Sequence, residues 1–151
     1  MPVIVVGADT PLGFRIVEAL ADTDQEVRAF VTDPEMRPRL KALGIKVATG
    51  DVSDASHVEG ACTNAFTVVL VTEAADDDRE RSFAPDRTAV LAGWAEAVGS
   101  AGVSRVIWID GGEPPTTQVT EEVVVDTAVP VDELLRRVVS LDEAESIPSR
   151  R

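Results

Sequence analysis

Two kinds of hydrophobic pattern alternate along the first two thirds of the chain. Short runs of β-branched residues are typical of strands buried in a parallel sheet, and apolar residues that recur every third or fourth position are typical of helices packed on such a sheet. The predicted strands are Val3–Val6, Val27–Val31, Ile45–Thr49, Phe66–Thr72 and Arg105–Ile109. The alternation therefore predicts βαβ units around a parallel sheet.

The helix predictions rest on the same spacing and on capping residues. In the first helix, Leu12, Ile16 and Leu20 recur every fourth residue after Pro11, a residue that suits a first helical turn. The other predicted helices run from the N-cap Asp33 to Gly44, from Asp54 to Ala61, from Ala84 to Ala101 and from Val131 to Leu141.

The last quarter of the chain begins with a break in the pattern. Two glycines and two prolines lie between Gly111 and Pro115, after the fifth predicted strand. Beyond them, Glu121 to Val129 predicts one more strand ahead of the terminal helix. We expect one domain over residues 1–145 and a loose tail at 146–151.

The charge of the chain argues against nucleic acid as a partner. Of the 151 residues, 27 are acidic and 14 basic, the net charge is −13, and Lys41 and Lys46 are the only lysines. Binding to a phosphate backbone relies on clustered Lys and Arg. We therefore expect no DNA or RNA partner.

Cysteine and histidine are nearly absent from the chain. Cys62 and His57 are the single residues of their types, so we expect no internal disulfide and no metal site. The longest apolar runs reach about six residues, whereas a membrane span needs roughly 20. These features predict a cytoplasmic protein without a membrane segment. The chain also contains no tyrosine.

A glycine-containing loop, Gly7 to Gly13, connects the first predicted strand to the first predicted helix and reads G-A-D-T-P-L-G. In dinucleotide-binding folds, glycines at this place allow a tight turn and let backbone N–H groups approach a pyrophosphate at the positive end of the helix. We name residues 7–13 the glycine loop.

Several motifs occur together with this loop. The second strand reads V-R-A-F-V-T-D-P from Val27 to Pro34, the third ends in Gly50-Asp51-Val52, and the fourth and fifth contain V-V-L-V-T and V-S-R-V-I-W-I. In this order, and with the G-x-x-G-x-x-G spacing of the loop, they resemble the atypical branch of the short-chain dehydrogenase/reductase superfamily, which includes NmrA-like NAD(P)-binding proteins. The resemblance covers about residues 3–113.

This resemblance implies a three-layer α/β Rossmann fold. The parallel sheet would have the order 3-2-1-4-5 with a possible sixth strand, helices would cover both faces, and the ligand would be NAD or NADP. The residues implied to contact the dinucleotide are Gly7, Thr10, Leu12, Gly13, Thr32, Asp33, Asp51, Val52 and Thr72.

Three residues of the loop depart from the family pattern. Thr10 replaces the middle glycine and adds a branched side chain, Asp9 adds a negative charge, and Pro11 lacks a backbone N–H donor. Each change is expected to weaken phosphate binding, unless Asp9 turns aside or caps the helix.

The residues after the second strand leave the choice between NAD and NADP open. Asp33 follows Gly13 by 20 residues, as expected of an acid that binds the ribose 2′-hydroxyl, but it also has the position of an N-cap before Pro34. Thr32 stands where NADP-binding relatives often carry Arg. Arg15 and Arg37 could supply positive charge or belong to solvated helix surfaces.

The catalytic residues of the superfamily are missing. Its reductases use a Tyr with a Lys four residues later, and Asp110 replaces the Ser or Thr expected after the fifth strand. Only about 36 residues follow Pro115, too few for the substrate lobe of longer relatives. We therefore predict no catalytic residues.

The leading prediction is a non-catalytic NAD(P)-binding or regulatory module. One alternative is an oxidoreductase or epimerase-like enzyme that uses Asp110 or Glu73. A second alternative is an interaction protein with a degenerate loop, which forms a possible homodimer through the helix at 84–101 and its Trp94.

Overall fold

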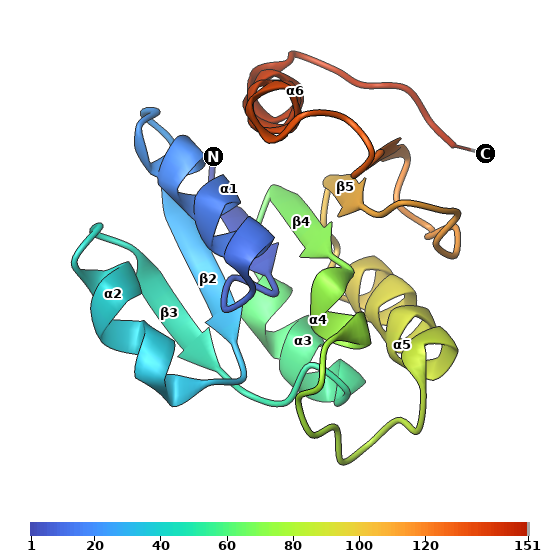
Figure 1. Cartoon of the computed structure of the whole chain (residues 1–151). Helices are drawn as coiled ribbons and strands as arrows, with labels where there is room; N and C mark the ends of the chain where they lie inside the picture. Colours follow the sequence, from blue (N-terminus) through green and yellow to red (C-terminus); the bar gives the residue numbers. More distant parts are fainter. Residues whose placement is uncertain (151) are drawn as a thin grey trace.

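Six parallel strands form one sheet in the computed structural model, which describes residues 1–150 (Figure 1). The strands are β1 (Val3–Val6), β2 (Val27–Val31), β3 (Lys46–Thr49), β4 (Thr67–Val71), β5 (Arg105–Ile109) and β6 (Glu121–Val125). Their order is β3-β2-β1-β4-β5-β6. The predicted order 3-2-1-4-5 and the sixth strand are confirmed.

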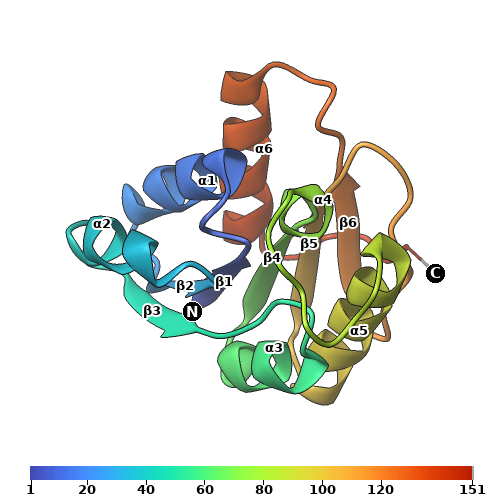
Figure 2. The same cartoon turned by 60° about the horizontal axis from the view of Figure 1, so that its bottom comes forward.

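Helices cover both faces of the sheet (Figure 2). They are α1 (Pro11–Ala21), the 3₁₀ turn η1 (Pro34–Met36), α2 (Arg37–Lys41), α3 (Ala55–Cys62), α4 (Glu73–Asp76), α5 (Arg87–Ser100) and α6 (Val131–Glu143). Helices α1, α2 and α6 pack on one face, and α3 and α5 pack on the other. The fold is thus the predicted three-layer Rossmann type. No helix in residues 1–150 has the length and apolar character that a membrane crossing requires.

The two-residue period of the strands divides their side chains between two cores. In β1, Val3 and Val5 pack with α1, while Ile4 and Val6 pack with α3 and α5. Because both faces are covered, all residues of β1, β4 and β5 are buried.

Capping residues begin the helices largely where the sequence predicts. The carboxylates of Asp33 and Asp54 accept hydrogen bonds from the N–H groups of Glu35 and Ser56, each at 2.9 Å. The helix expected after Asp33 is divided into η1 and the short α2. Helix α4, which has one turn and directly follows β4, is not indicated by the sequence pattern.

Residues 146–150 are not the loose tail that the sequence suggests, and position 151 of that predicted tail lies outside the described residues. Glu122 of β6 is fully buried, and its carboxylate accepts hydrogen bonds from Trp108, Thr117 and Arg150. The Glu122 N–H also donates to the Pro148 carbonyl at 3.1 Å. A buried carboxylate requires a charged partner, and Arg150 at 3.1 Å supplies it. Residues 146–150 are therefore bound to β6.

Trp94 lies inside the protein rather than on the surface of α5. Its side chain is fully buried, and its indole N–H donates to the Val52 carbonyl at 2.7 Å. The interpretation of Trp94 as a dimer contact is therefore wrong. A homodimer through other residues of α5 stays a prediction.

Cys62 should be chemically inert in the folded protein. It is the last residue of α3 and is buried in the core, and burial raises the pKa of its thiol to about 12. We expect no reaction with a colorimetric thiol reagent at pH 8 in native protein, and one thiol per chain in denaturant. Fast stoichiometric reaction of the native protein would contradict this packing.

Candidate functional site

The candidate site lies at the carboxyl ends of the strands. The chain leaves β1 toward β2 on one side of the sheet centre, and β4 lies on the other side, so the strand order reverses between β1 and β4. Ligands of open α/β sheets bind in the crevice at such a switch point. The glycine loop follows β1 at this place.

Two glycines allow the loop to turn tightly. Gly7 has φ +88°, and a Cβ on it would lie 2.9 Å from the Val71 carbonyl oxygen. A Cβ on Gly13 would lie only 2.0 Å from the Gly7 carbonyl oxygen. Neither position tolerates a side chain, so the predicted roles of both glycines in shaping the turn agree with the geometry.

Thr10 folds into the loop instead of standing in front of it. Its hydroxyl donates to the Gly7 carbonyl at 2.7 Å and accepts from the Gly13 N–H at 2.9 Å. The residue is 1% exposed and is the N-cap of α1. The Thr10 side chain therefore does not stand in front of the loop, but its hydroxyl occupies the Gly13 N–H.

Asp9 turns away from the start of α1. Its Oδ2 accepts hydrogen bonds from the N–H groups of Thr32 and Asp33, both at 2.9 Å, just after β2. The guanidinium of Arg79 donates to both carboxylate oxygens at 2.9 and 3.0 Å. The open option that Asp9 turns aside is the one observed, and its charge is compensated there.

Two departures remove a donor from the start of α1: the Thr10 hydroxyl already accepts from the Gly13 N–H, and Pro11 cannot donate. Pro11 occupies the first position of α1 and has no N–H. Leu12 retains its N–H in the first helical turn, where amides have no carbonyl partner within the helix. Leu12 is therefore the residue of this turn best placed to donate to a pyrophosphate.

A cavity of about 430 Å³ lies on the β2 side of the glycine loop, and we name it the smaller cavity. Its lining includes Asp9, Thr32, Asp33, Asp51, Arg79 and Ser82. Three predicted contact residues, Thr32, Asp33 and Asp51, are thus brought together. Arg37 instead donates to the Thr49 hydroxyl, so it supplies no charge to this lining.

Val52 and Asp51 are both engaged within the protein. Val52 is buried, and its N–H donates to the Thr32 hydroxyl at 3.3 Å. The Asp51 carboxylate accepts from the N–H and hydroxyl of Ser53 and from the N–H of Ser82. Burial alone would raise the pKa of Asp51, but these hydrogen bonds lower it.

The loop formed by residues 77–83 borders the smaller cavity and is held by ion pairs. Asp77 pairs with Arg79 at 2.7 Å and with Arg81 at 3.4 Å, and Arg79 also pairs with Asp9. Burial would raise the pKa of Asp77, but hydrogen bonds from Arg79 lower it. Asp77 is therefore fixed by ion pairs within the protein.

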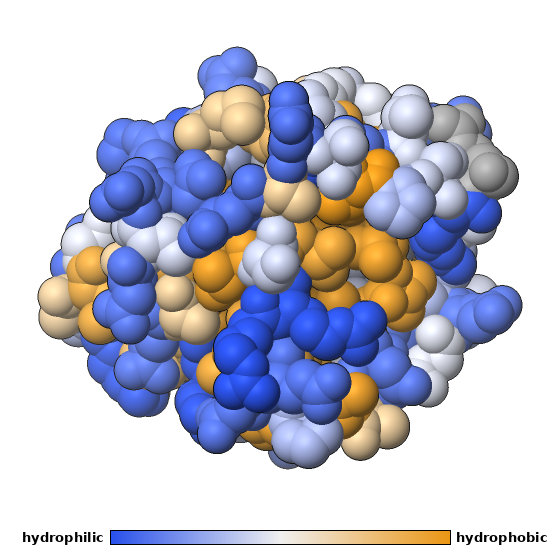
Figure 3. All heavy atoms as spheres, turned by 90° about the horizontal axis from the view of Figure 1, so that it is seen from above, coloured by the Kyte–Doolittle hydropathy of each residue, from blue (hydrophilic) through white to orange (hydrophobic). Residues whose placement is uncertain are grey.

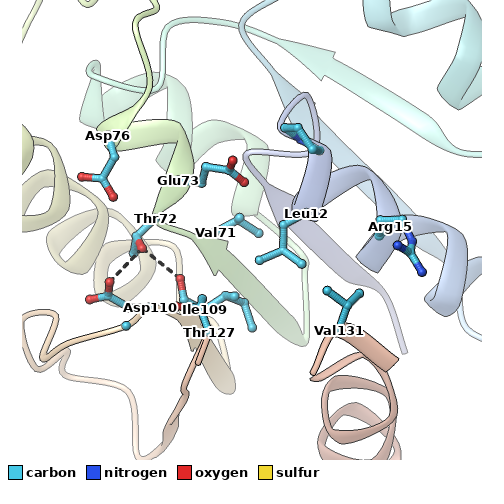
Figure 4. A pocket seen from close by; sticks show the side chains of 12 residues that line it. Leu12, Arg15, Val71, Thr72, Glu73, Asp76, Ile109, Asp110, Thr127 and Val131 are labelled. Carbon is cyan, nitrogen blue, oxygen red and sulfur yellow. Dashed lines mark hydrogen bonds between the residues drawn. The ribbon is translucent and has the colours of Figure 1, made fainter. Parts of the chain in front are cut away.

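A second cavity of about 570 Å³ lies on the other side of the glycine loop, and we name it the larger cavity (Figure 4). Its lining includes Leu12, Val71, Thr72, Ile109, Asp110 and Val131. In Figure 4, Thr72 and Asp110 lie on one side of the cavity, and Leu12 and Val131 lie on the other. Figure 3 shows apolar side chains gathered in a hollow of one molecular face, framed by hydrophilic groups.

Asp110, itself buried, is held by a hydrogen-bond network at the end of β5. Its Oδ1 accepts from the Thr72 hydroxyl at 3.0 Å and from Arg87 at 2.6 Å, while Arg87 also bonds to Asp76 at 2.6 Å. Asp110 is 5% exposed, and within residues 1–150 its Oδ2 has no hydrogen-bond partner. The position of the Asp110 carboxylate is therefore fixed by Thr72 and Arg87.

Sequence reasoning missed the arginines of this site. Arg79 and Arg87 belong to no recognised motif, and the loops that carry them fold back on residues about 70 and 23 positions away. One signal was available: in a chain with only 14 basic residues, three arginines at 79, 81 and 87 accompany three consecutive aspartates at 76–78.

The geometry fits a nicotinamide dinucleotide. A cradle of side-chain-free backbone at Gly7 and Gly13 lies between two cavities of about 430 and 570 Å³. Such a ligand has two nucleoside halves joined by a pyrophosphate, and the site has the same division into two cavities with a helix start between them.

Comparison with known proteins agrees with this geometry. The NAD(P)H-binding family matches residues 7–136. The quinone oxidoreductase QOR2 of Escherichia coli, solved with NADPH, is 23% identical with a TM-score of 0.59; the match covers 72% of this chain and 36% of that one. None of the curated proteins compared matches the chain.

Two further solved structures have the same fold over most of this chain. Triphenylmethane reductase of Citrobacter sp., complexed with NADP(H), is 16% identical with a TM-score of 0.61, over 92% of this chain and 45% of that one. ChuY, an anaerobillin reductase of Escherichia coli O157:H7, is 16% identical with a TM-score of 0.66, over 97% and 92%. This chain thus spans under half the length of QOR2 and of triphenylmethane reductase.

A side chain at Gly13 should disrupt the loop. In Gly13→Ala the new Cβ overlaps the Gly7 carbonyl, so we expect a loss of about 3 kcal/mol or more in the free energy of unfolding. Gly60→Ala, inside α3 with open space around it, should instead stabilise by about 0.5–1 kcal/mol. Denaturant unfolding measures both, and equal effects would contradict the tight turn.

Proposed function

This chain belongs to the NAD(P)H-binding family, and we propose that it acts as a non-catalytic dinucleotide-binding or regulatory module. The observation that carries the proposal is the pair of cavities on either side of the glycine loop. A nicotinamide dinucleotide would supply hydride chemistry when bound, but the tyrosine that protonates the product in the superfamily is missing.

The residues of the chain divide the work of holding such a ligand. The N–H of Leu12 and the positive end of α1 attract the pyrophosphate. The adenosine half belongs in the smaller cavity, next to Thr32 and Asp33. The nicotinamide half belongs in the larger cavity, where Val71 and Ile109 give an apolar wall.

Binding of the coenzyme tests the proposal directly. We expect saturable one-to-one binding of a nicotinamide dinucleotide by calorimetry, together with a rise in melting temperature. Absence of both heat and thermal shift at millimolar ligand would overturn the proposal.

A restored donor should tighten binding. Pro11→Ala returns a backbone N–H to the first turn of α1, and a hydrogen bond to a charged group contributes about 1.5–3 kcal/mol, so we expect roughly tenfold tighter binding or more. Pro38→Ala is the matched control, since Pro38 lies exposed in the first turn of α2. Equal affinities in wild type and Pro11→Ala would show that the pyrophosphate does not bind at this turn.

The second candidate function is a reductase that uses Asp110. Asp110 lines the larger cavity, and its buried Oδ2, which has no hydrogen-bond partner among residues 1–150, could accept a hydrogen bond or a proton from a substrate. The short chain does not argue against this candidate, because ChuY, matched over 92% of its length, is named a reductase. Glu73 lines the same cavity.

Turnover separates the two candidates. Under the leading proposal we expect no NADH or NADPH consumption with quinone acceptors, and coenzyme binding that persists in Asp110→Asn. The matched control is Asp76→Asn, which removes the other carboxylate bonded to Arg87. Turnover by the wild type that is lost in Asp110→Asn but kept in Asp76→Asn would establish the reductase instead.

A further inference from the structure

The Asp9 carboxylate occupies a ready-made anion site. Two backbone N–H groups, of Thr32 and Asp33, and the guanidinium of Arg79 converge on it at 2.9–3.0 Å. The Asp9 side chain is 1% exposed. Backbone N–H groups and a guanidinium are the donors that proteins use to bind phosphate. Here an internal carboxylate already uses all three.

The anion site lies where the adenosine ribose of a bound coenzyme is expected. The donors follow β2 directly and line the smaller cavity, on the adenosine side of the glycine loop. In dinucleotide folds the residues after this strand contact the adenosine ribose, at the 2′-hydroxyl of NAD or the 2′-phosphate of NADP. A 2′-phosphate would find these donors already bonded to Asp9, and the negative charge of the Asp9 carboxylate would repel it.

The other charged residues that line the smaller cavity also disfavour a 2′-phosphate. Its lining contains Asp9, Asp33, Asp51, Asp77, Asp78 and Glu80, and Arg79 is the one cation among its lining residues in the described part of the chain. Arg79 is also bound to Asp77 through Nε and Nη2 at 2.7–3.0 Å. Burial would lower the pKa of Arg79, but Asp77 and Asp9 raise it, so its positive charge is retained and used internally.

We propose that Asp9 is a specificity-determining residue, which excludes the 2′-phosphate and thereby selects NAD(H) over NADP(H). The inference rests on the proposed coenzyme binding and adds which coenzyme is bound. The residue that distinguishes the two coenzymes would then lie in the glycine loop, which in this fold normally contacts the pyrophosphate, and not directly after β2. The chain would thus differ from neighbours solved with NADPH or NADP(H).

The test compares NAD⁺ with NADP⁺, and 5′-AMP with 2′,5′-ADP, by calorimetry. These pairs differ only by the 2′-phosphate. We expect the wild type to prefer NAD⁺ by about a hundredfold or more. In Asp9→Asn and in Asp9→Ser the preference should fall at least about tenfold, chiefly through tighter NADP⁺ binding. Both changes remove the carboxylate charge that pairs with Arg79 Nη1. The shorter side chain of Asp9→Ser also releases the N–H groups of Thr32 and Asp33, whereas the amide oxygen of Asp9→Asn can still accept from them.

Two controls test whether the effect depends on the position of Asp9 and not only on the loss of one negative charge. Asp24→Asn removes the same charge from an exposed turn outside both cavity linings and should leave the preference unchanged. Asp9→Ser combined with Arg79→Gln should lose the gained NADP⁺ affinity. Thermal unfolding of each variant verifies that the loop and β2 remain folded.

The outcomes separate the two proposals. If NAD⁺ and NADP⁺ bind the wild type equally, or if the preference is the same in folded Asp9→Asn and Asp9→Ser, the specificity inference is overturned while coenzyme binding stands. If no dinucleotide or adenosine phosphate binds the wild type or either variant, the proposed function fails, and this inference fails with it.

Discussion

The carbonyl oxygen of Gly7 organises the site. It accepts hydrogen bonds from the N–H of Thr10 at 3.1 Å and from the Thr10 hydroxyl at 2.7 Å, and the Cα of Gly13 packs against it. These contacts fix the angle at which the chain leaves β1 and enters α1. The position of the helix end, the direction of the Asp9 side chain and the separation of the two cavities all depend on this turn.

Around this turn, several arginines of this acidic chain form ion pairs within the protein. Arg79 joins the glycine loop to the 77–83 loop, and Arg87 joins the end of β5 to α4. Arg105 of β5 donates to the carbonyls of Leu141 and Ala144 at the end of α6. Because the paired side chains of Asp9 and Asp110 are 1% and 6% exposed, salt screens them far less than it screens surface pairs.

The sheet and its order could be predicted because they depend on local patterns. Runs such as Phe66–Thr72 and capping residues such as Asp54 act over a few positions, and the motifs of the glycine loop and β2 fixed the topology by resemblance. The site was predicted less well. Gly7, Gly13, Thr32 and Asp33 do come together, but where Asp9 and Thr10 point depends on Arg79 and on the Gly7 carbonyl. A contact across 70 residues leaves no periodic signal in the sequence.

The segment bound to β6 has a consequence for the behaviour of the protein in solution. Strand β6 lies at one end of the sheet, and an uncovered edge strand presents unpaired N–H and C=O groups to other chains. The hydrogen bond from Glu122 to Pro148, and the Arg150 contacts with the Pro114 and Pro115 carbonyls, lay the last residues across this edge. Residues 146–150 thus cover part of an edge that would otherwise be open to pairing with another chain, where the charge of −13 would oppose association only at low ionic strength.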